Sequence, residues 1–147
     1  MRVFIASDHA GVDLKERVLE LIREAGHDVR DLGPTDSSSV DYPDFGHKVA
    51  AAVVAGEAKA GILICGTGIG MSMTANRHPG VRAALCHDAF TAEMARRHND
   101  ANVLCIGARV IGVGVAEQMV GVFLNTSFEG GRHQRRVDLI EIEREDS

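Results

Sequence analysis

The sequence predicts an α/β fold in which one doubly wound, five-stranded parallel sheet carries helices on both faces and is followed by a C-terminal helix. Three observations lead to this prediction. Short apolar runs alternate with longer segments whose apolar residues recur at helical spacing. The apolar runs are nearly continuous, as in strands that are buried on both faces of a parallel sheet. The chain has 147 residues, the size of one domain, so residues 1–147 are assigned to a single domain.

The first half of the chain contains two strand–helix units. Its predicted elements are a strand at 2–7, a helix at 12–25, a strand at 27–32 and a helix at 43–55. Gly26 follows the first helix at the position where a glycine commonly ends one. After the second strand, the polar loop 33–41 leads to Pro43, and proline is favoured in the first turn of a helix.

The second half continues the alternation with three more units. Its predicted elements are a strand at 60–65, a helix at 69–77, a strand at 81–86, a helix at 88–98, a strand at 102–106 and a helix at 112–124. Asp88 can cap the helix that reaches His98, because an aspartate side chain accepts hydrogen bonds from the free backbone N–H groups of the first turn.

The tail 131–145 combines Val137, Leu139, Ile140 and Ile142 with many charged residues. It is a candidate final helix. Its apolar face has no strand of its own to cover, so we expect it to pack against a neighbouring subunit. The alternative is a charged and partly frayed terminus, since chain ends often lack order.

The strand–helix alternation also predicts where a ligand binds. In a flavodoxin-like strand order of 2-1-3-4-5, the first and third strands lie side by side at the switch point of the sheet. Ligands bind there, outside the carboxyl ends of the strands. Asp8 and His9 follow the first strand, whereas Cys65 and Gly66 end the third.

The composition excludes several classes of function. The formal net charge of −5 argues against nucleic acid as a partner. Cys65, Cys86 and Cys105 all fall in apolar runs, and an odd number of such cysteines fits a reducing cytosol. No signal peptide precedes the first strand, and no apolar run approaches the ~18 residues of a membrane span. We therefore expect a cytoplasmic protein with no membrane partner.

The segment 62–70 carries the strongest chemical signal, because an apolar run ends in Cys65 and passes directly into glycines at every second position. Gly66, Gly68 and Gly70 allow a sharp turn whose N–H groups approach a ligand closely. With the positive end of the following helix, these groups can bind an anion and favour a thiolate at Cys65. The alternative is a buried cysteine before an ordinary turn.

Nucleotide binding is a weaker interpretation of the same glycines. Their spacing is G-x-G-x-G after the third strand, whereas the dinucleotide fingerprint is G-x-G-x-x-G after the first. No Lys-Ser or Lys-Thr pair follows, so the turn does not match a P-loop either.

Two histidine-containing segments are further candidates. Asp8 and His9 can hydrogen-bond a sugar, although Asp8 can equally serve as a helix N-cap. His98, followed by Asn99, can transfer a proton near neutral pH and so open a cyclic sugar. The alternative role for His98 is to complement the negative end of a helix.

Arginines near the C-terminus are candidates for binding phosphate. Arg132 and Arg136 are four residues apart, which places both on one face of a helix. A solvated basic turn is the alternative, and Arg109 is a candidate third cation. The histidines and cysteines lack the Cys-x-x-Cys and His-x-x-x-His spacings of metal sites, so no metal is expected.

These segments together resemble a known family, the ribose-5-phosphate isomerases of type B, also called the LacA/LacB or RpiB sugar-phosphate isomerases. The resemblance extends essentially from end to end. The motifs that carry it are Ser7-Asp8-His9-Ala10-Gly11, Asp41-Tyr42-Pro43, Gly61-Ile62-Leu63-Ile64-Cys65-Gly66-Thr67-Gly68-Ile69-Gly70, Arg97-His98-Asn99-Asp100, Asn102-Val103 and Glu129-Gly130-Gly131-Arg132-His133.

The resemblance implies a cofactor-independent aldose–ketose isomerase that interconverts ribose-5-phosphate and ribulose-5-phosphate. In this family the base is a cysteine ending the third strand or a glutamate just after the glycine loop. Here those positions are Cys65 and Met71, so the chain is similar to the cysteine type, with His98 opening the furanose ring. The substrate-binding residues implied are Asp8, His9, Tyr42, Gly66, Thr67, Gly68, Ile69, Gly70, Asn99, Arg109, Arg132 and Arg136.

The resemblance further implies a homodimer, or a dimer of such dimers, in which the loop of His98 faces the partner's active site. Three alternatives stay open. The motifs do not separate a pentose phosphate from galactose-6-phosphate or allose-6-phosphate. A non-catalytic subunit that binds sugar phosphate and a flavodoxin-like nucleotide module are the other two.

Overall fold

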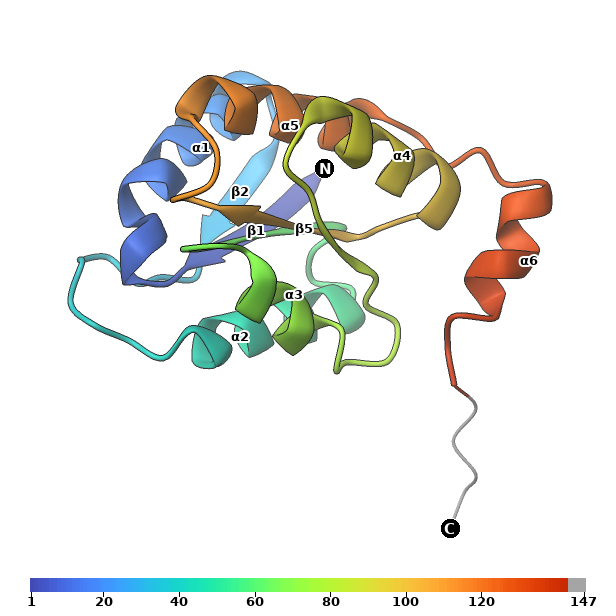
Figure 1. The fold of residues 1–147 in the computed structure, drawn as a ribbon, viewed down its shortest axis with the longest axis horizontal. Coiled ribbons are helices and arrows are strands. Elements are labelled where there is room, and N and C mark those ends of the chain that lie inside the picture. Colours follow the sequence, from blue (N-terminus) through green and yellow to red (C-terminus); the bar gives the residue numbers. More distant parts are fainter. Residues whose placement is uncertain (143–147) are drawn as a thin grey trace, which may run out of the picture.

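The computed structural model describes residues 1–142 as a three-layer α/β sandwich (Figure 1). Its central sheet has five strands, and every strand pair is parallel. The strands are β1 (Arg2–Ser7), β2 (Asp28–Asp31), β3 (Ala60–Cys65), β4 (Ala83–Leu85) and β5 (Val103–Gly107). Each lies within a run predicted to be a strand or extends it by one residue.

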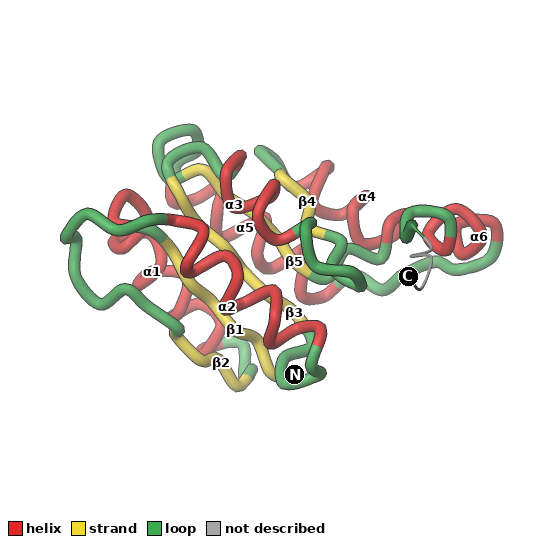
Figure 2. Tube along the Cα trace, turned by 90° about the horizontal axis from the view of Figure 1, so that it is seen from below, coloured by secondary structure: helices red, strands yellow, loops and turns green. Residues whose placement is uncertain are grey.

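The helices of the described residues are α1 (Val12–Glu24), α2 (Tyr42–Val54), α3 (Ile69–Ala75), α4 (Ala89–Asn99), α5 (Val113–Asn125) and α6 (Arg132–Asp138), with a short 3-10 turn, η1 (His9–Gly11), before α1. The first five form two layers, one on each face of the sheet. In Figure 1, α1, α4 and α5 lie above the sheet, and α2 and α3 lie below it. Figure 2 shows α2 crossing β1 and β3 on that lower face. The predicted fold class is confirmed.

The strand order is β2-β1-β3-β5-β4, which confirms the predicted neighbours β1 and β3 and corrects the order of the last two strands. The predicted order 2-1-3-4-5 placed β5 at the edge, whereas β5 pairs with β3 and β4 forms the edge. The different burial of β4 and β5 explains the observed order. All five residues of β5 are buried, whereas β4 has only three residues and each is half-buried. The longer, fully buried strand β5 therefore lies in the interior of the sheet, and β4 lies at its edge.

The exposed edge of β4 is protected from pairing with another chain. The side-chain amide of Asn76 donates to the carbonyl oxygen of Ala83 at 3.0 Å, and its oxygen accepts from the Ala83 N–H at 2.8 Å. An unpaired strand edge invites edge-to-edge association, so this side chain satisfies the backbone where a further strand would otherwise bind.

Helix α6 stands apart from the two layers, beyond the end of α4 (Figures 1 and 2). Only His133 and Val137 on it are buried, whereas Leu139 and Ile142 after it are 71% and 88% exposed. The predicted final helix is thus present as seven residues. The part of the predicted tail helix beyond residue 142 lies outside the described residues. None of the helices described within residues 1–142 is long and apolar enough to span a bilayer.

Candidate active site

The carboxyl ends of β1 and β3 form the floor of the candidate site. Ser7 and Ile64 are register partners, and the Asp8 N–H donates to the carbonyl oxygen of Ile64 at 3.0 Å. This pairing brings the residues that follow the two strands, Asp8 and Cys65, to the same edge of the sheet. Asp8 is buried, and its Oδ1 accepts from the Ala10 N–H at 2.9 Å. Asp8 therefore caps the turn η1 as well as lying at the switch point.

Cys65 is buried on the α2 and α3 side of the sheet, and its Sγ accepts a hydrogen bond from the Gly68 N–H at 3.1 Å. Gly68 adopts a φ of +79°, and a Cβ added there would lie 2.6 Å from Cδ1 of Leu85. Only glycine allows this turn, which directs a backbone N–H at the sulfur. A donor at this position stabilises a thiolate.

The other two cysteines lack the features of a reactive thiol. Complete burial raises the pKa of Cys105 well above its ordinary value. Burial also raises the pKa of Cys86, although a hydrogen bond with Thr91 opposes the shift. Both groups therefore remain protonated thiols near neutral pH.

Predicted binding residues lie against the first and the last glycine of the glycine loop. The Arg109 N–H donates to the Gly66 carbonyl at 3.0 Å, and the guanidinium lies 3.6 Å from where a Gly66 Cβ would be. The Tyr42 ring lies 2.6 Å from the position of a Gly70 Cβ. Gly70 thus allows the close approach of Tyr42, whereas a Cβ at Gly66 would make only an ordinary contact with Arg109. Thr67 is exposed, and its Oγ1 accepts a hydrogen bond from the N–H of Ile69, two residues later, at 3.2 Å.

His9 is held by the loop that precedes α2. Its Nδ1 lies 3.2 Å from the backbone N of Val40. A backbone N–H can only donate, so Nδ1 must be the acceptor and a neutral His9 carries its proton on Nε2. His9 is therefore set to donate a hydrogen bond from Nε2.

The second group of predicted site residues lies at the opposite end of the sheet. His98 and Asn99 end α4, just before β5 begins at Val103. Val103 pairs with Gly61, whereas Cys65 pairs with Gly107. Four residues of strand separate these register positions, which corresponds to about 13 Å. Within one chain, the structure therefore does not bring His98 and Asn99 to Cys65.

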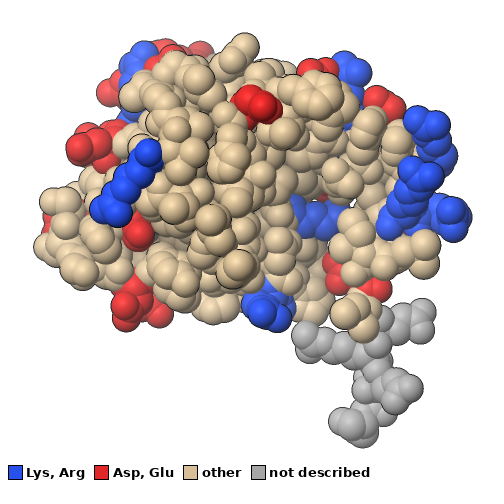
Figure 3. All heavy atoms as spheres, viewed as in Figure 1, with Lys and Arg blue, Asp and Glu red and all other residues tan. Residues whose placement is uncertain are grey.

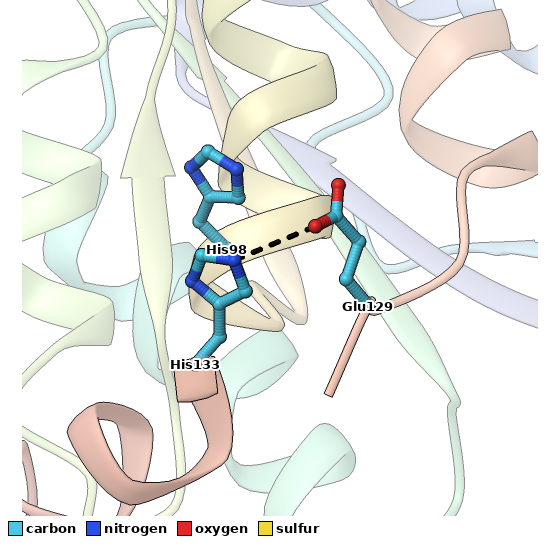
Figure 4. Close-up of side chains that lie close together, drawn as sticks. All are labelled: His98, Glu129 and His133. Carbon is cyan, nitrogen blue, oxygen red and sulfur yellow. Dashed lines mark ion pairs between the residues drawn. The ribbon is translucent and has the colours of Figure 1, made fainter. Parts of the chain in front are cut away.

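His98 has neighbours that the sequence prediction missed. Figure 4 shows its ring lying against that of His133, with centroids 4.3 Å apart and planes inclined by 12°. Nε2 of His133 lies 3.4 Å from a carboxylate oxygen of Glu129. The spacing of Glu129 and His133, four residues apart, was the available signal, but they are in contact with His98 only through tertiary structure.

The same three side chains offer donors to a divalent cation. One donor atom from each of His98, Glu129 and His133 lies within 4.8 Å of the others. The lone pairs of an imidazole lie in the plane of its ring, and the two planes are nearly parallel. The lone pairs therefore do not converge, and one ring would have to leave the stack before both could bind a metal.

Basic side chains gather near His98. Arg132, Arg135 and Arg136 lie on α6, and all three are exposed. Figure 3 shows Lys and Arg side chains concentrated at the end of the molecule where α6 lies. The predicted phosphate-binding pair is thus on a helix, on the same side of the molecule as His98 and remote from the third cation, Arg109.

A cleft of about 610 Å³ lies elsewhere, between the β4 edge and residues 140–142. Its polar lining is largely occupied by internal hydrogen bonds. Asn76 binds the β4 backbone, Arg82 donates to the carbonyls of Asn99 and Asp100, and Glu141 accepts from Gly80. These bonds leave the cleft with little chemistry of its own.

The chain is similar to known proteins over nearly its whole length. The family model described as "Ribose/Galactose Isomerase" matches residues 3–140. Ribose-5-phosphate isomerase B of Escherichia coli (strain K12) is 43% identical over 139 residues, which cover 95% of this chain and 93% of that protein.

Solved structures are similarly close. Ribose-5-phosphate isomerase B of Clostridium thermocellum matches with a TM-score of 0.94 and 48% identity over 95% of each chain. The Mycoplasma genitalium enzyme of the same name, solved with bound ribulose-5-phosphate, matches with a TM-score of 0.90 and 46% identity over 95% of this chain and 93% of that one. The chain therefore belongs to the ribose/galactose isomerase family of sugar-phosphate isomerases.

Proposed function

We propose that this isomerase interconverts ribose-5-phosphate and ribulose-5-phosphate through an enediolate, with Cys65 as the base. The observation that carries the proposal is the hydrogen bond from the Gly68 N–H to the Cys65 sulfur at the switch point of the sheet. It joins a group that can accept a proton to a loop whose N–H groups can stabilise an oxyanion. The proposed chemistry needs no cofactor.

The reaction moves one proton between neighbouring carbons. The Cys65 thiolate takes the proton from C2 of the open aldose, and the electron pair of that bond forms the C1–C2 double bond of the enediolate. Charge accumulates on O1, which the N–H groups of the loop from Gly66 to Gly70 stabilise. The thiol then returns the proton to C1, while the hydroxyl proton of O2 passes to O1. The product is the ketose.

Ring opening and binding are assigned to the remaining predicted residues. His98 donates a proton to the ring oxygen of the furanose and so opens it. Asp8, His9, Tyr42 and Asn99 bind the sugar. The phosphate-binding arginines are Arg109, Arg132 and Arg136. Binding a phosphate away from the reacting carbons orients them for proton transfer.

The proposed site needs two chains. His98 and the α6 arginines lie at the end of the sheet opposite to Cys65, so a second copy must supply them. Exposed apolar residues support such an interface. Leu139, Ile140 and Ile142 follow α6, and Ile69 and Met73 lie on α3 beside the glycine loop. We therefore propose a homodimer, or a dimer of such dimers, with each active site shared.

A coupled assay tests the proposed function. The values of kcat/KM are compared for ribose-5-phosphate, galactose-6-phosphate and allose-6-phosphate. We expect the pentose phosphate to be preferred. A preference for one of the hexose phosphates would support the alternative substrate class. No turnover of any of them, with binding retained, would support a non-catalytic subunit instead.

A further inference from the structure

Lys15, on the first turns of α1, is a charged side chain enclosed by the protein, with 1% of its surface exposed. A buried ammonium group is strongly unfavourable unless it is paired and hydrogen-bonded. Its Nζ lies 3.0 Å from a carboxylate oxygen of Asp31 and also donates to the carbonyl oxygen of Pro34. Both partners lie at one place in the chain, where β2 ends and the segment 32–41 begins.

This contact belongs to a network that reaches the floor of the candidate site. The Asp31 oxygen that contacts Lys15 also accepts from the Gly33 N–H at 2.8 Å. The Gly33 carbonyl in turn accepts from the Ser7 N–H at 3.1 Å, and Ser7 directly precedes Asp8. Lys15 is therefore joined through Asp31 and Gly33 to the end of β1.

The segment 32–41 touches the candidate site again at its other end. The Val40 N–H donates to Nδ1 of His9 at 3.2 Å and so determines which nitrogen of that ring carries the proton. Tyr42, two residues later, begins α2 and packs against Gly70 of the glycine loop. One segment thus sets the position of two predicted substrate-binding residues, and Lys15 anchors its start.

We propose that Lys15 is a positioning residue for substrate binding: it holds the segment 32–41 so that Val40 fixes the proton of His9 on Nε2 and Tyr42 lies over the glycine loop. This role deepens the proposed function and rests on it. Lys15 does not itself touch the substrate, because it lies beneath the segment and is enclosed by it.

The test uses the full-length protein and two variants, Lys15→Met and Asp31→Asn. Lys15→Met keeps the length of the side chain and removes the ammonium group. Asp31→Asn keeps Lys15 and weakens the contact between its ammonium group and residue 31, whose side chain is partly exposed. This variant therefore tests the same contact even if Lys15→Met fails to fold. Arg17→Met is the matched control, since Arg17 is on the same helix and pairs with Glu20 and Glu117 on the outer surface.

The first measurement is made without substrate and does not depend on activity. The ¹⁵N shifts of His9 report its tautomer, and hydrogen exchange reports the Val40 N–H. In both test variants we expect a mixture of His9 tautomers and roughly tenfold faster exchange at Val40, because the segment opens locally. Circular dichroism should show that the fold is retained. In Arg17→Met all these quantities should match the wild type.

The second measurement is isomerase kinetics. A binding group displaced by about 1 Å can cost up to ~10²-fold, so kcat/KM should fall roughly 10- to 100-fold in Lys15→Met, and less in Asp31→Asn. Loss of thermal stability with an unchanged His9 tautomer and unchanged Val40 exchange would overturn the proposal and leave Lys15 a structural residue. A wild type that turns over no sugar phosphate would refute the proposed function, whereas the measurements on His9 and Val40 would still decide the role of Lys15.

Discussion

At the scale of single residues, the distinction between Cys65 and the other two cysteines explains most of the proposed chemistry. All three side chains are buried. Burial alone favours the neutral thiol, as it does for Cys105. Cys65 differs because it ends a strand at the switch point and receives the N–H of Gly68. A residue type common in protein cores therefore acquires a different role from its position on the backbone.

Replacing Cys65 tests its assignment as the base. Cys65→Ala should lose roughly 10²- to 10⁴-fold in kcat, the usual contribution of a general base, while it binds substrate with near-wild-type affinity. Single-turnover kinetics and calorimetric titration measure the two quantities. Cys86→Ala serves as the control, because it also removes a buried thiol and should retain wild-type kcat. More than about a tenth of the wild-type kcat in Cys65→Ala would assign the proton transfer to another group.

The arginines of α6 provide a second test at this scale. Arg132→Ala and Arg136→Ala should each raise KM for the phosphorylated sugar, because each removes a charge-assisted hydrogen-bond donor to the phosphate. Free ribose should be a very poor substrate of the wild type. Arg135→Ala is the control, since Arg135 is exposed on the same helix and lies outside the predicted pair. If the first two variants behave like the control, the phosphate binds elsewhere.

At the scale of elements, the glycine loop between β3 and α3 depends on a conformation that side chains disfavour. Gly68 has a φ of +79°, and its missing Cβ leaves room for Leu85 and for the backbone of Ile106. The loop therefore fits against β4 and β5 only while this position is glycine. That fit is also what directs the Gly68 N–H at Cys65.

Two glycine substitutions separate this requirement from a general effect of adding a methyl group. Gly68→Ala should lower the free energy of unfolding by about 1–3 kcal/mol or more and abolish most activity, because the loop must move. Gly114→Ala should raise the free energy of unfolding by about 0.5–1 kcal/mol and leave activity unchanged. Gly114 lies within α5, and nothing lies within 4 Å of its missing Cβ. Urea unfolding and the isomerase assay measure the two effects. A stable, active Gly68→Ala would contradict the proposed role of the loop.

At the scale of the whole molecule, the candidate residues occupy two ends of one sheet. Cys65 and the glycine loop lie at the carboxyl end of β3, whereas His98 and α6 lie at the end where β5 begins. This separation follows from the right-handed alternation of strands and helices, which returns the end of each helix to the start of the next strand. Under the proposed function, a single chain therefore carries two half-sites, which a two-fold arrangement would join.

Subunit mixing tests the shared site directly. Cys65→Ala and His98→Ala subunits, each inactive alone, are mixed and allowed to exchange. In a mixed dimer one site collects both defects and the other is intact. Random pairing gives about half mixed dimers, so roughly a quarter of the wild-type activity should return. No recovery after exchange has been confirmed by mass spectrometry would place Cys65 and His98 in the same chain's site.

The sequence by itself determined the elements and the location of the proton-transferring half of the candidate site. Helical periodicity and continuous apolar runs are local properties, so the five strands and the helices α1 to α5 were predictable within a few residues. The tail predicted at 131–145 is helical only over Arg132–Asp138 within the described residues. The adjacency of Asp8 and Cys65 was also predictable, because the carboxyl ends of neighbouring parallel strands share one edge.

Only the tertiary structure decided the features that depend on competition between distant segments. The order of β4 and β5 was one, since both are short apolar runs and only their burial in the finished sheet distinguishes them. Two further features of this kind are the contact of His98 with His133 and the burial of Lys15 against Asp31. Each joins residues whose local patterns carry no information about their partner, because packing of the whole chain places them together.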